Sequence, residues 1–173
     1  MANVGFDCAV AREASRIKKR KFFSPSFSYT LGVLKVFFRK IGTPMRLIFD
    51  DGEVWDGVYT LTAIGNGKFC GGGYKALPSA RLDDEQIDIC SIKKVSHLTL
   101  LRLIGSYKKG THLKNKRAAS LFNTKTAKHF KMEFDSPVPL CIDGEIKGAK
   151  SIDFTVIKNA FNFVIPAGSE FIG

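Results

Sequence analysis

The sequence predicts a mainly β protein, an antiparallel β-sandwich with helical insertions. Apolar and polar residues alternate with a period of two over many short segments, turn-forming residues separate these segments, and only two longer segments show the period of a helix. Many short strands with few helices are typical of sheet-on-sheet packing. No internal repeat and no linker rich in Pro or Ser divides the sequence, so we expect one domain over residues 1–173.

Two helical insertions are expected, near residues 26–41 and 96–106. In the first, apolar residues recur at helical spacing from Phe27 to Ile41, after a Ser-Pro-Ser start signal. These apolar residues cover most of the helix, so we expect it to be packed on most sides, with a lipid-facing role as the alternative. Residues 11–20 are expected to form a short basic helix ahead of it.

The expected strands fall in two groups. Residues 45–49 and 55–64 are predicted to form a hairpin around the Asp-Asp-Gly turn at 50–52, and a third strand is predicted at 87–95. Residues 108–126 are polar and basic and give no clear pattern. The last third of the chain is strand-rich, and its four expected strands lie at residues 130–134, 138–142, 152–157 and 161–165.

Composition restricts the class of protein. Hydrophobic residues make up 45% of the chain, with 15 Phe, which excludes a disordered chain. A net charge of +11 favours an anionic partner: an anionic membrane face, a nucleotide or a nucleic acid. The four cysteines are widely spaced and lack a zinc-ligand pattern, which indicates reduced thiols in a cytosolic protein. No apolar run is long enough to predict a membrane-spanning segment.

The first candidate site is the segment GNGKFCGGGYKALPSARLDDEQID at 65–88. Its glycines predict a shaped loop, and Asp83, Asp84 and Glu85 follow that loop. Carboxylates and backbone carbonyls are the ligands that Mg²⁺ and Ca²⁺ prefer, whereas the alternative is a solvated acidic turn before a strand. Because the segment has no GxxxxGK[ST] phosphate loop, no clear G-x-G-x-x-G before a helix and no calcium-loop pattern, chemistry here would need residues from elsewhere.

The second candidate site is Asp143-Gly144-Glu145, between two expected strands. An Asp-Gly pair is a strong signal for a hairpin turn, which is one interpretation. The other is a general base beside a cation bound to phosphate. The three histidines lie on different expected elements and show no partner pattern, so we expect them to be surface or packing residues.

The order of these motifs resembles the C-terminal domain of the diacylglycerol kinase-type lipid kinases, which include bacterial diacylglycerol kinases and sphingosine kinases. The ordered set carries the resemblance, rather than any single motif, and it covers nearly the whole chain. The matching segments are NVGFDCAVA at 3–11, FDDGEVWDG at 49–57, the loop at 65–88, KGTHL at 109–113, IDGE at 142–145 and NAFNFVIPAG at 159–168.

The resemblance implies catalytic roles for the second site. Glu145 would be the base that takes the proton from the hydroxyl of the acceptor lipid, and Asp143 and Gly144 would lie by the nucleotide phosphates and their Mg²⁺. In the first site, members of the family hold a structural Mg²⁺ with one carboxylate and two backbone carbonyls.

The matching positions here are the Asp84 carboxylate and the carbonyls of Arg81 and Gln86. The family usually has Gly where this chain has Glu85, which bears on the conformation of the loop. The side chains of Arg81 and Gln86 need not be of a ligand type, because only their main-chain oxygens would bind the ion.

The implied function is that of the acceptor-side domain of an ATP-dependent lipid kinase in phospholipid metabolism, which phosphorylates a lipid hydroxyl of the diacylglycerol type. Its cofactors would be Mg²⁺ and ATP, with ATP held mostly by a separate N-terminal domain that carries a GGDGT motif. The sequence has no GGDGT, so we expect the chain alone to be inactive or nearly so. The expected location is the cytoplasm, peripheral to the inner face of the membrane, and exposed strand edges leave a homodimer open.

Two other hypotheses concern function. A non-catalytic β-sandwich module that binds an anionic membrane or a partner protein is the alternative to the kinase domain. Nucleic-acid binding is suggested by the charge alone. We do not expect it, because the aromatic residues fall at alternating, core-like positions rather than between Lys and Arg.

Overall fold

The computed structural model describes residues 1–18, 35–38, 41–70, 73–160 and 164. The strands in this part of the chain are β1 (Ala2–Gly5), β2 (Thr43–Phe49), β3 (Val54–Gly65), β4 (Ile87–Lys93), β5 (Phe122–Ala127), β6 (His129–Ile142) and β7 (Glu145–Thr155). The helices are α1 (Phe6–Lys18), α3 (His97–Lys109) and α4 (Lys116–Ala119), and residues 35–37 are also helical. Strands predominate, which confirms the predicted mainly β class.

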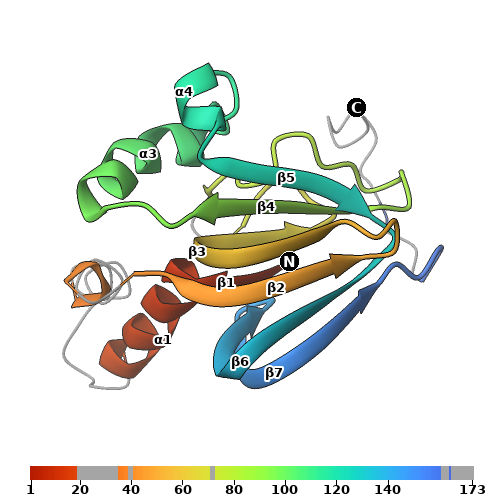
Figure 1. Cartoon of the computed structure of the whole chain (residues 1–173), viewed down its shortest axis with the longest axis horizontal. Coiled ribbons are helices and arrows are strands. Elements are labelled where there is room, and N and C mark those ends of the chain that lie inside the picture. Colours follow the sequence, from red (N-terminus) through yellow and green to blue (C-terminus); the bar gives the residue numbers. More distant parts are fainter. Residues whose placement is uncertain (19–34, 39–40, 71–72, 161–163, 165–173) are drawn as a thin grey trace.

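All the strand pairings are antiparallel, as predicted. The order is β1-β6-β2-β3-β4-β5, with β7 paired to β6 and with β1 paired to β3 as well as to β6. Since β2 also joins β6 to β3, the four strands β1, β3, β2 and β6 close into a barrel-like ring (Figure 1). The strands β4 and β5 extend the sheet beyond β3, and β7 extends it beyond β6.

The β2–β3 hairpin forms as its period of two predicts. Met45, Leu47 and Phe49 are buried, and the residues between them are more exposed. Gly52, with a φ of 84°, completes the turn and donates a backbone hydrogen bond of 3.0 Å to the Phe49 carbonyl. The hairpin places the apolar face of β2 inside the ring.

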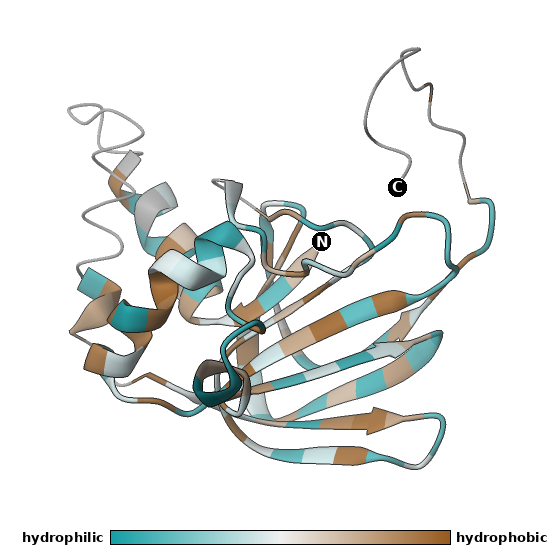
Figure 2. Ribbon diagram, turned by 90° about the horizontal axis from the view of Figure 1, so that it is seen from above, coloured by the Kyte–Doolittle hydropathy of each residue, from teal (hydrophilic) through white to brown (hydrophobic). Residues whose placement is uncertain are grey.

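The middle of the sheet is covered on both faces. Tyr59–Ile64 of β3 and Asp88–Ile92 of β4 are continuously buried. One face packs with α1 and α3 in a cluster that includes Val10, Leu100 and Leu103. The other packs inside the ring, in a cluster that includes Leu47, Trp55, Phe130 and Met132. The two clusters on opposite faces of the sheet give the fold its sandwich-like layers. The helices lie together at one end of the strands, as Figure 2 shows.

The α3 helix confirms the predicted helix at 96–106 and extends to Lys109. The Ser96 hydroxyl accepts a hydrogen bond of 3.2 Å from the Thr99 N–H, which satisfies a free donor of the first turn. Gly110, with a φ of 71°, ends the helix in the left-handed conformation that glycine adopts readily.

The α1 helix begins at Phe6, five residues before the helix predicted at 11–20. Gly5 makes this early start feasible: its φ is 92°, and an added Cβ would lie 2.5 Å from the Thr60 carbonyl oxygen. The chain therefore turns from β1 into α1 against the backbone of β3, in a space that only glycine fits.

Three other predictions have different outcomes. The segments 130–134 and 138–142, predicted as separate strands, form the single strand β6, with a shift of register between Glu133 and Val138. The helix predicted at 26–41 and the strand predicted at 161–165 lie mostly outside the described residues. No helix among the described residues is both long enough and apolar enough to cross a bilayer.

Candidate functional site

The candidate site is a groove at one end of the ring, where the ends of β1, β3, β4 and β6 lie side by side. Ala2 of β1 pairs with Ile142 of β6 and with Ile64 of β3. Ile64 pairs in turn with Ile89 of β4. The groove has a volume of about 610 Å³ and is lined by residues from the segments 1–2, 64–66, 82–87, 142 and 154–160.

The same rim carries both candidate sites. Gly65 pairs with Asp88, which follows the acidic loop, and the Asp143 N–H donates a hydrogen bond of 2.9 Å to the Met1 carbonyl. From Asp143 to Asp88 the rim crosses three strand pairings, β6 to β1, β1 to β3 and β3 to β4. Adjacent strands lie about 4.8 Å apart, so the two residues are separated by roughly 14 Å. The strand pairing of β1 therefore brings the glycine-rich acidic loop and the Asp143–Glu145 turn to one end of the sheet.

The acidic loop is held by its own side chains. The Asp84 Oδ1 atom accepts a hydrogen bond of 3.0 Å from the Gln86 N–H. The Arg81 guanidinium donates two hydrogen bonds, of 3.1 and 3.2 Å, to the Asp83 carboxylate, and this pair holds the pKa of Asp83 below its usual value. Asp83 is thus engaged by Arg81, and Asp84 is a half-buried carboxylate at the turn.

Glu85 adopts a backbone conformation that favours glycine. Its φ is 57°, in the left-handed region. The resemblance to lipid kinases predicts Gly at this position, and the loop has a glycine-type conformation although Glu occupies it. The Glu85 carboxylate forms an ion pair with Lys158, which lowers its pKa and joins the loop to the segment after β7 across the groove.

Asp88, which follows the acidic loop, has a carboxylate oxygen without a partner. Asp88 is 8% exposed, and its Oδ2 atom is buried without a hydrogen bond. Burial, and then the charge of Asp84, raise the pKa of Asp88 to about 6. In the described part of the chain, no three His, Cys, Asp or Glu side chains converge as a metal site, so an ion would also need backbone oxygens. Such a set of carboxylate and carbonyl oxygens fits Mg²⁺.

The second site is a tight hairpin turn between β6 and β7. Asp143 and Gly144 have φ values of 46° and 90°, which are typical of the two central residues of a type I′ turn. Ile142 and Glu145 form the last pair before the turn. The turn is also joined to β1, because the Met1 amino group donates a hydrogen bond of 2.8 Å to Asp143 Oδ1.

Glu145 points into solvent. Its side chain is 78% exposed, and it forms an ion pair with Lys147, with 3.9 Å between Nζ and Oε2. A carboxylate in this position can accept a proton from a molecule that approaches the rim from outside. Glu145 follows Ile142, which lines the groove, by three residues.

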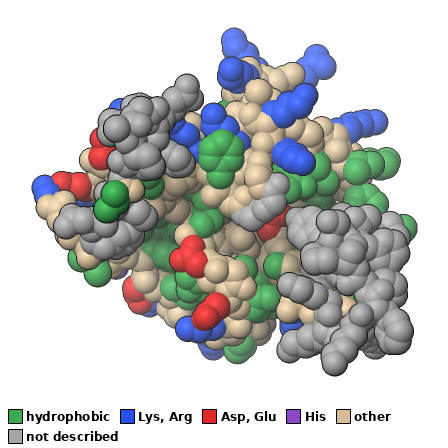
Figure 3. Space-filling model, turned by 180° about the vertical axis from the view of Figure 1, so that it is seen from behind, with side chains coloured by type: hydrophobic (Ala, Val, Ile, Leu, Met, Phe, Trp, Pro, Cys, Tyr) green, Lys and Arg blue, Asp and Glu red, His purple; other side chains and the backbone are tan. Residues whose placement is uncertain are grey.

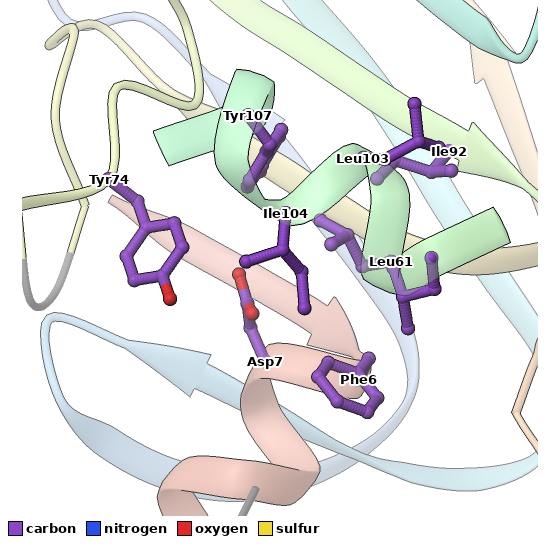
Figure 4. Close-up of a pocket in the computed structure, with 9 residues that line it drawn as sticks. Phe6, Asp7, Leu61, Tyr74, Ile92, Leu103, Ile104 and Tyr107 are labelled. Carbon is purple, nitrogen blue, oxygen red and sulfur yellow. The ribbon is translucent and has the colours of Figure 1, made fainter. Parts of the chain in front are cut away.

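A second, smaller cavity lies between α1 and α3, over β3 and β4 (Figure 4). It has a volume of about 30 Å³, room for about one water molecule. Its walls are mostly apolar, but the Asp7 carboxyl faces Ile104 there, and burial raises the pKa of Asp7 to about 6. The hydroxyl of Tyr107, which also lines the cavity, is buried without a hydrogen-bond partner.

Comparison with known proteins identifies the family. Residues 1–165 match the family described as the YegS C-terminal NAD kinase beta sandwich-like domain. The chain belongs to this family. The predicted resemblance to the C-terminal domain of lipid kinases is thereby confirmed, and the barrel-like β fold agrees with it.

Relatives and solved structures agree with membership of the YegS C-terminal domain family. The "Probable lipid kinase YegS-like" protein of Alcanivorax borkumensis is 23% identical over 173 residues, which are 100% of this chain and 56% of the relative. The "Diacylglycerol kinase" of Mycobacterium tuberculosis H37Rv is 31% identical over 113 residues, 65% of this chain and 36% of the relative. The chain spans about a third to a little over half of the length of the curated relatives it matches.

Two solved structures from Bacillus anthracis str. Sterne share the fold. A crystal structure of a diacylglycerol kinase has a TM-score of 0.51 and 16% identity, and the match covers 87% of this chain and 43% of that one. A second structure has a TM-score of 0.55 and 22% identity, with coverage of 73% and 43%. At these identities the likeness concerns the fold.

Two acidic residues in this member of the YegS C-terminal domain family had no predicted role. Asp88 directly follows the acidic loop, but in the sequence it stands as an ordinary strand residue between two isoleucines. Asp7 lies in the motif at 3–11, and its position in the first turn of α1 emerges only once the helix is seen to start at Phe6. Three consecutive apolar or small residues after Asp7, which favour burial, were the available signal.

Proposed function

We propose that the chain is the acceptor-side domain of an ATP-dependent lipid kinase that phosphorylates a lipid hydroxyl, of the diacylglycerol type. The observation that carries the proposal is the shared rim: Asp83 and Glu85 of the acidic loop line the groove together with Ile142, which directly precedes the Asp143–Glu145 turn. Its family membership and the names of its relatives support the same class of reaction. The groove volume, about 610 Å³, lies in the range of small-molecule sites.

In the proposed reaction, the lipid hydroxyl lies beside Glu145. The Glu145 carboxylate accepts the hydroxyl proton while the lipid oxygen forms a bond to the γ-phosphorus of ATP, and the bond from that phosphorus to ADP breaks. Asp143 and Gly144 lie by the phosphates. The exposure of Glu145 suits this role, since the base must reach a substrate that arrives from outside the domain.

The acidic loop would hold Mg²⁺ through the Asp84 carboxylate and the carbonyls of Arg81 and Gln86. The ion, when bound, supplies positive charge that fixes the loop. The Asp84 hydrogen bond to the Gln86 N–H and the left-handed Glu85 already fold this turn. Asp88, with its unpartnered oxygen, follows Gln86 by two residues.

The proposal also covers the partners. ATP is held mainly by a nucleotide domain with a GGDGT motif, so the chain alone does not turn over. The apolar residues of the groove meet the acyl chains. The domain works in the cytoplasm at the anionic inner face of a membrane. The edges of β5 and β7, each paired on one side along the described strands, leave a homodimer open.

The test supplies the nucleotide domain that the proposed reaction needs. The chain is joined to the GGDGT domain of a relative, and transfer of labelled phosphate from ATP to diacylglycerol in mixed micelles is measured. Glu145→Gln and Glu145→Ala should each lower the rate by about 10²–10⁴-fold, the usual contribution of a general base, with an unchanged melting temperature. Lys147→Ala, two residues away and equally exposed, is the control. Full turnover by either Glu145 variant would refute the role of Glu145.

A further inference from the structure

The positive charge of the chain comes from one continuous segment. Residues 89–132 contain eleven Lys and Arg and no Asp or Glu, and the net charge of the whole chain is +11. The rest of the sequence is therefore balanced. This basic segment comprises β4 after its first two residues, then α3, α4, β5 and the first residues of β6. A net positive charge that is confined to one part of a fold indicates a local binding surface for an anionic partner.

The α3 helix turns an apolar and basic face to solvent. Leu98 and Leu101 are 66% and 57% exposed. At 100° per residue, Arg102 and Lys109 fall on the same side of the helix, and both are exposed. The opposite side packs on the sheet through Leu100, Leu103 and Tyr107. Two exposed leucines on the solvent face of a well-packed helix are not needed for the core.

Neighbouring residues enlarge this face at both ends. Beside the start of α3, Phe37 packs its ring against His97 at 5.1 Å between centroids, and Phe38 next to it is 79% exposed. Beyond the end of α3, Lys116 and Arg117 of α4 are exposed. Figure 3 shows Lys and Arg side chains gathered over this end of the molecule.

The basic side chains of this face have no acidic partners. Among the described residues, none of Arg102, Lys109, Lys116 and Arg117 forms an ion pair with a carboxylate, whereas Lys125 and Lys131, on the sheet, do. Unpaired cations beside exposed leucines are the pattern of an interfacial helix, in which the apolar residues enter the acyl region and the cations meet lipid phosphates.

We propose that the outer face of α3, with Phe38 and α4, is the surface by which the domain docks on an anionic lipid bilayer. Leu98 and Leu101 insert among the acyl chains, and Arg102, Lys109 and the α4 cations bind the phosphates of the headgroups. The inference extends the proposed function, since it names the membrane-facing side. The inner side of the same helix lines the α1–α3 cavity, so docking places that cavity one helix away from the lipid.

Binding of the chain to vesicles tests this inference without any nucleotide. The chain is sedimented with vesicles of phosphatidylcholine that contain one third phosphatidylglycerol, and with vesicles of phosphatidylcholine alone. It should bind the anionic vesicles at low salt, and binding should weaken as salt rises. Leu98→Ser with Leu101→Ser should lower the affinity by about tenfold or more. Arg102→Glu with Lys109→Glu should lower it by at least about 25-fold, about fivefold for each charge removed.

Matched controls keep the same chemistry on other surfaces. Lys147→Glu with Lys150→Glu on β7 gives the same change of net charge, and Val54→Ser removes an exposed apolar side chain from β3. Both should change the affinity by less than about threefold, because they lie outside the basic segment. Equal losses in the control and α3 variants would overturn the proposed face, as would parent-like binding by the leucine variant.

Two further outcomes are decisive. If the chain does not bind anionic vesicles but binds single-stranded DNA with a steep dependence on salt, the outer face of α3 is a nucleic-acid surface and the inference fails. Phosphate transfer to a soluble short-chain diacylglycerol, measured with the nucleotide domain present, should be unaffected by the α3 variants and lowered by about 10²–10⁴-fold by Glu145→Gln. Failure of the kinase proposal is thereby distinguished from failure of the docking face.

Discussion

The Asp84 carboxylate accepts a hydrogen bond of 3.0 Å from the Gln86 N–H, so the acidic loop closes around the single residue between them. That residue is Glu85, with a φ of 57°. The three residues form a local turn that holds the backbone of Glu85 in the left-handed region. Residues with a branched Cβ atom are strongly disfavoured in this region. The resulting strain can be measured.

Substitution of Glu85 should separate backbone strain from side-chain interactions. In Glu85→Gly, relief of a left-handed residue, about 1–2 kcal/mol, is offset by the greater freedom of glycine and the lost ion pair with Lys158, so the free energy of unfolding should change by less than about 1 kcal/mol. Glu85→Val should lose about 1–2 kcal/mol, because it adds a β-branched side chain. Urea unfolding followed by circular dichroism measures both. Equal stability of the Gly and Val variants would mean that the turn is not strained.

Magnesium should stabilise the folded chain through Asp84. A ligand at a hundred times its dissociation constant adds about 2.7 kcal/mol, which for a chain of this size raises the melting temperature by about 5–10 °C. Asp84→Ala should remove the shift. Asp83→Ala should retain it, because the Asp83 carboxylate is already bound by Arg81. A parent that shows no shift, or the same shift in Asp84→Ala, would count against the 81–86 loop as the site.

Asp7 should make stability fall as pH rises. Burial raises its pKa from 3.8 to about 6 in the folded state, so between these values the folded chain keeps a proton that the unfolded chain releases. Asp7→Asn should match the parent near pH 4. Above about pH 6 it should be more stable than the parent by about 1–3 kcal/mol.

Urea unfolding at pH 4 and pH 7.5 checks the Asp7 prediction, with Asp135→Asn, on the exposed middle of β6, as the control for loss of one charge. A constant difference between parent and Asp7→Asn over this range would show that Asp7 is ionised in the folded protein.

Two glycine substitutions should have opposite results. Gly5→Ala puts a Cβ 2.5 Å from the Thr60 carbonyl oxygen at a φ of 92°, so the free energy of unfolding should drop by more than about 2 kcal/mol. At Gly148 on β7, a Cβ would meet no atom within 4 Å, and Gly148→Ala should be neutral or stabilising by up to about 1 kcal/mol. Thermal unfolding compares the two. A Gly5→Ala chain as stable as Gly148→Ala would contradict the close approach of α1 to β3.

The sequence predicts the elements whose signals are local. The β2–β3 hairpin, the start of α3 at Ser96 and the Asp143–Gly144 turn each depend on a few adjacent residues, and each forms where it is predicted. The β6 strand shows the limit. Ser136 and Pro137 look like a strand break, yet the strand continues because Pro137 lies where the pairing with β7 is already shifted, at a point where no ladder hydrogen bond is needed.

The candidate site is predictable in its parts but not in its assembly. The glycines and carboxylates of each loop predict that loop from the sequence alone. Their common rim depends on β1, which pairs with residues about 60 and 140 positions away, and no local pattern encodes such a pairing. The burial of Asp88 and the partial burial of Asp7 are likewise properties of the assembled layers.

The double pairing of β1 has a consequence for engineering. The four-residue strand Ala2–Gly5 is paired along both of its edges: Val4 pairs with Thr62 of β3 on one side and with Leu140 of β6 on the other. The spacing of the two loops therefore depends on β1, which lies between the strands that lead to them. A redesigned or shortened β1 would leave every carboxylate in the sequence and still move Glu145 away from the acidic loop, so the relative position of the two candidate sites depends on the shortest of the described strands.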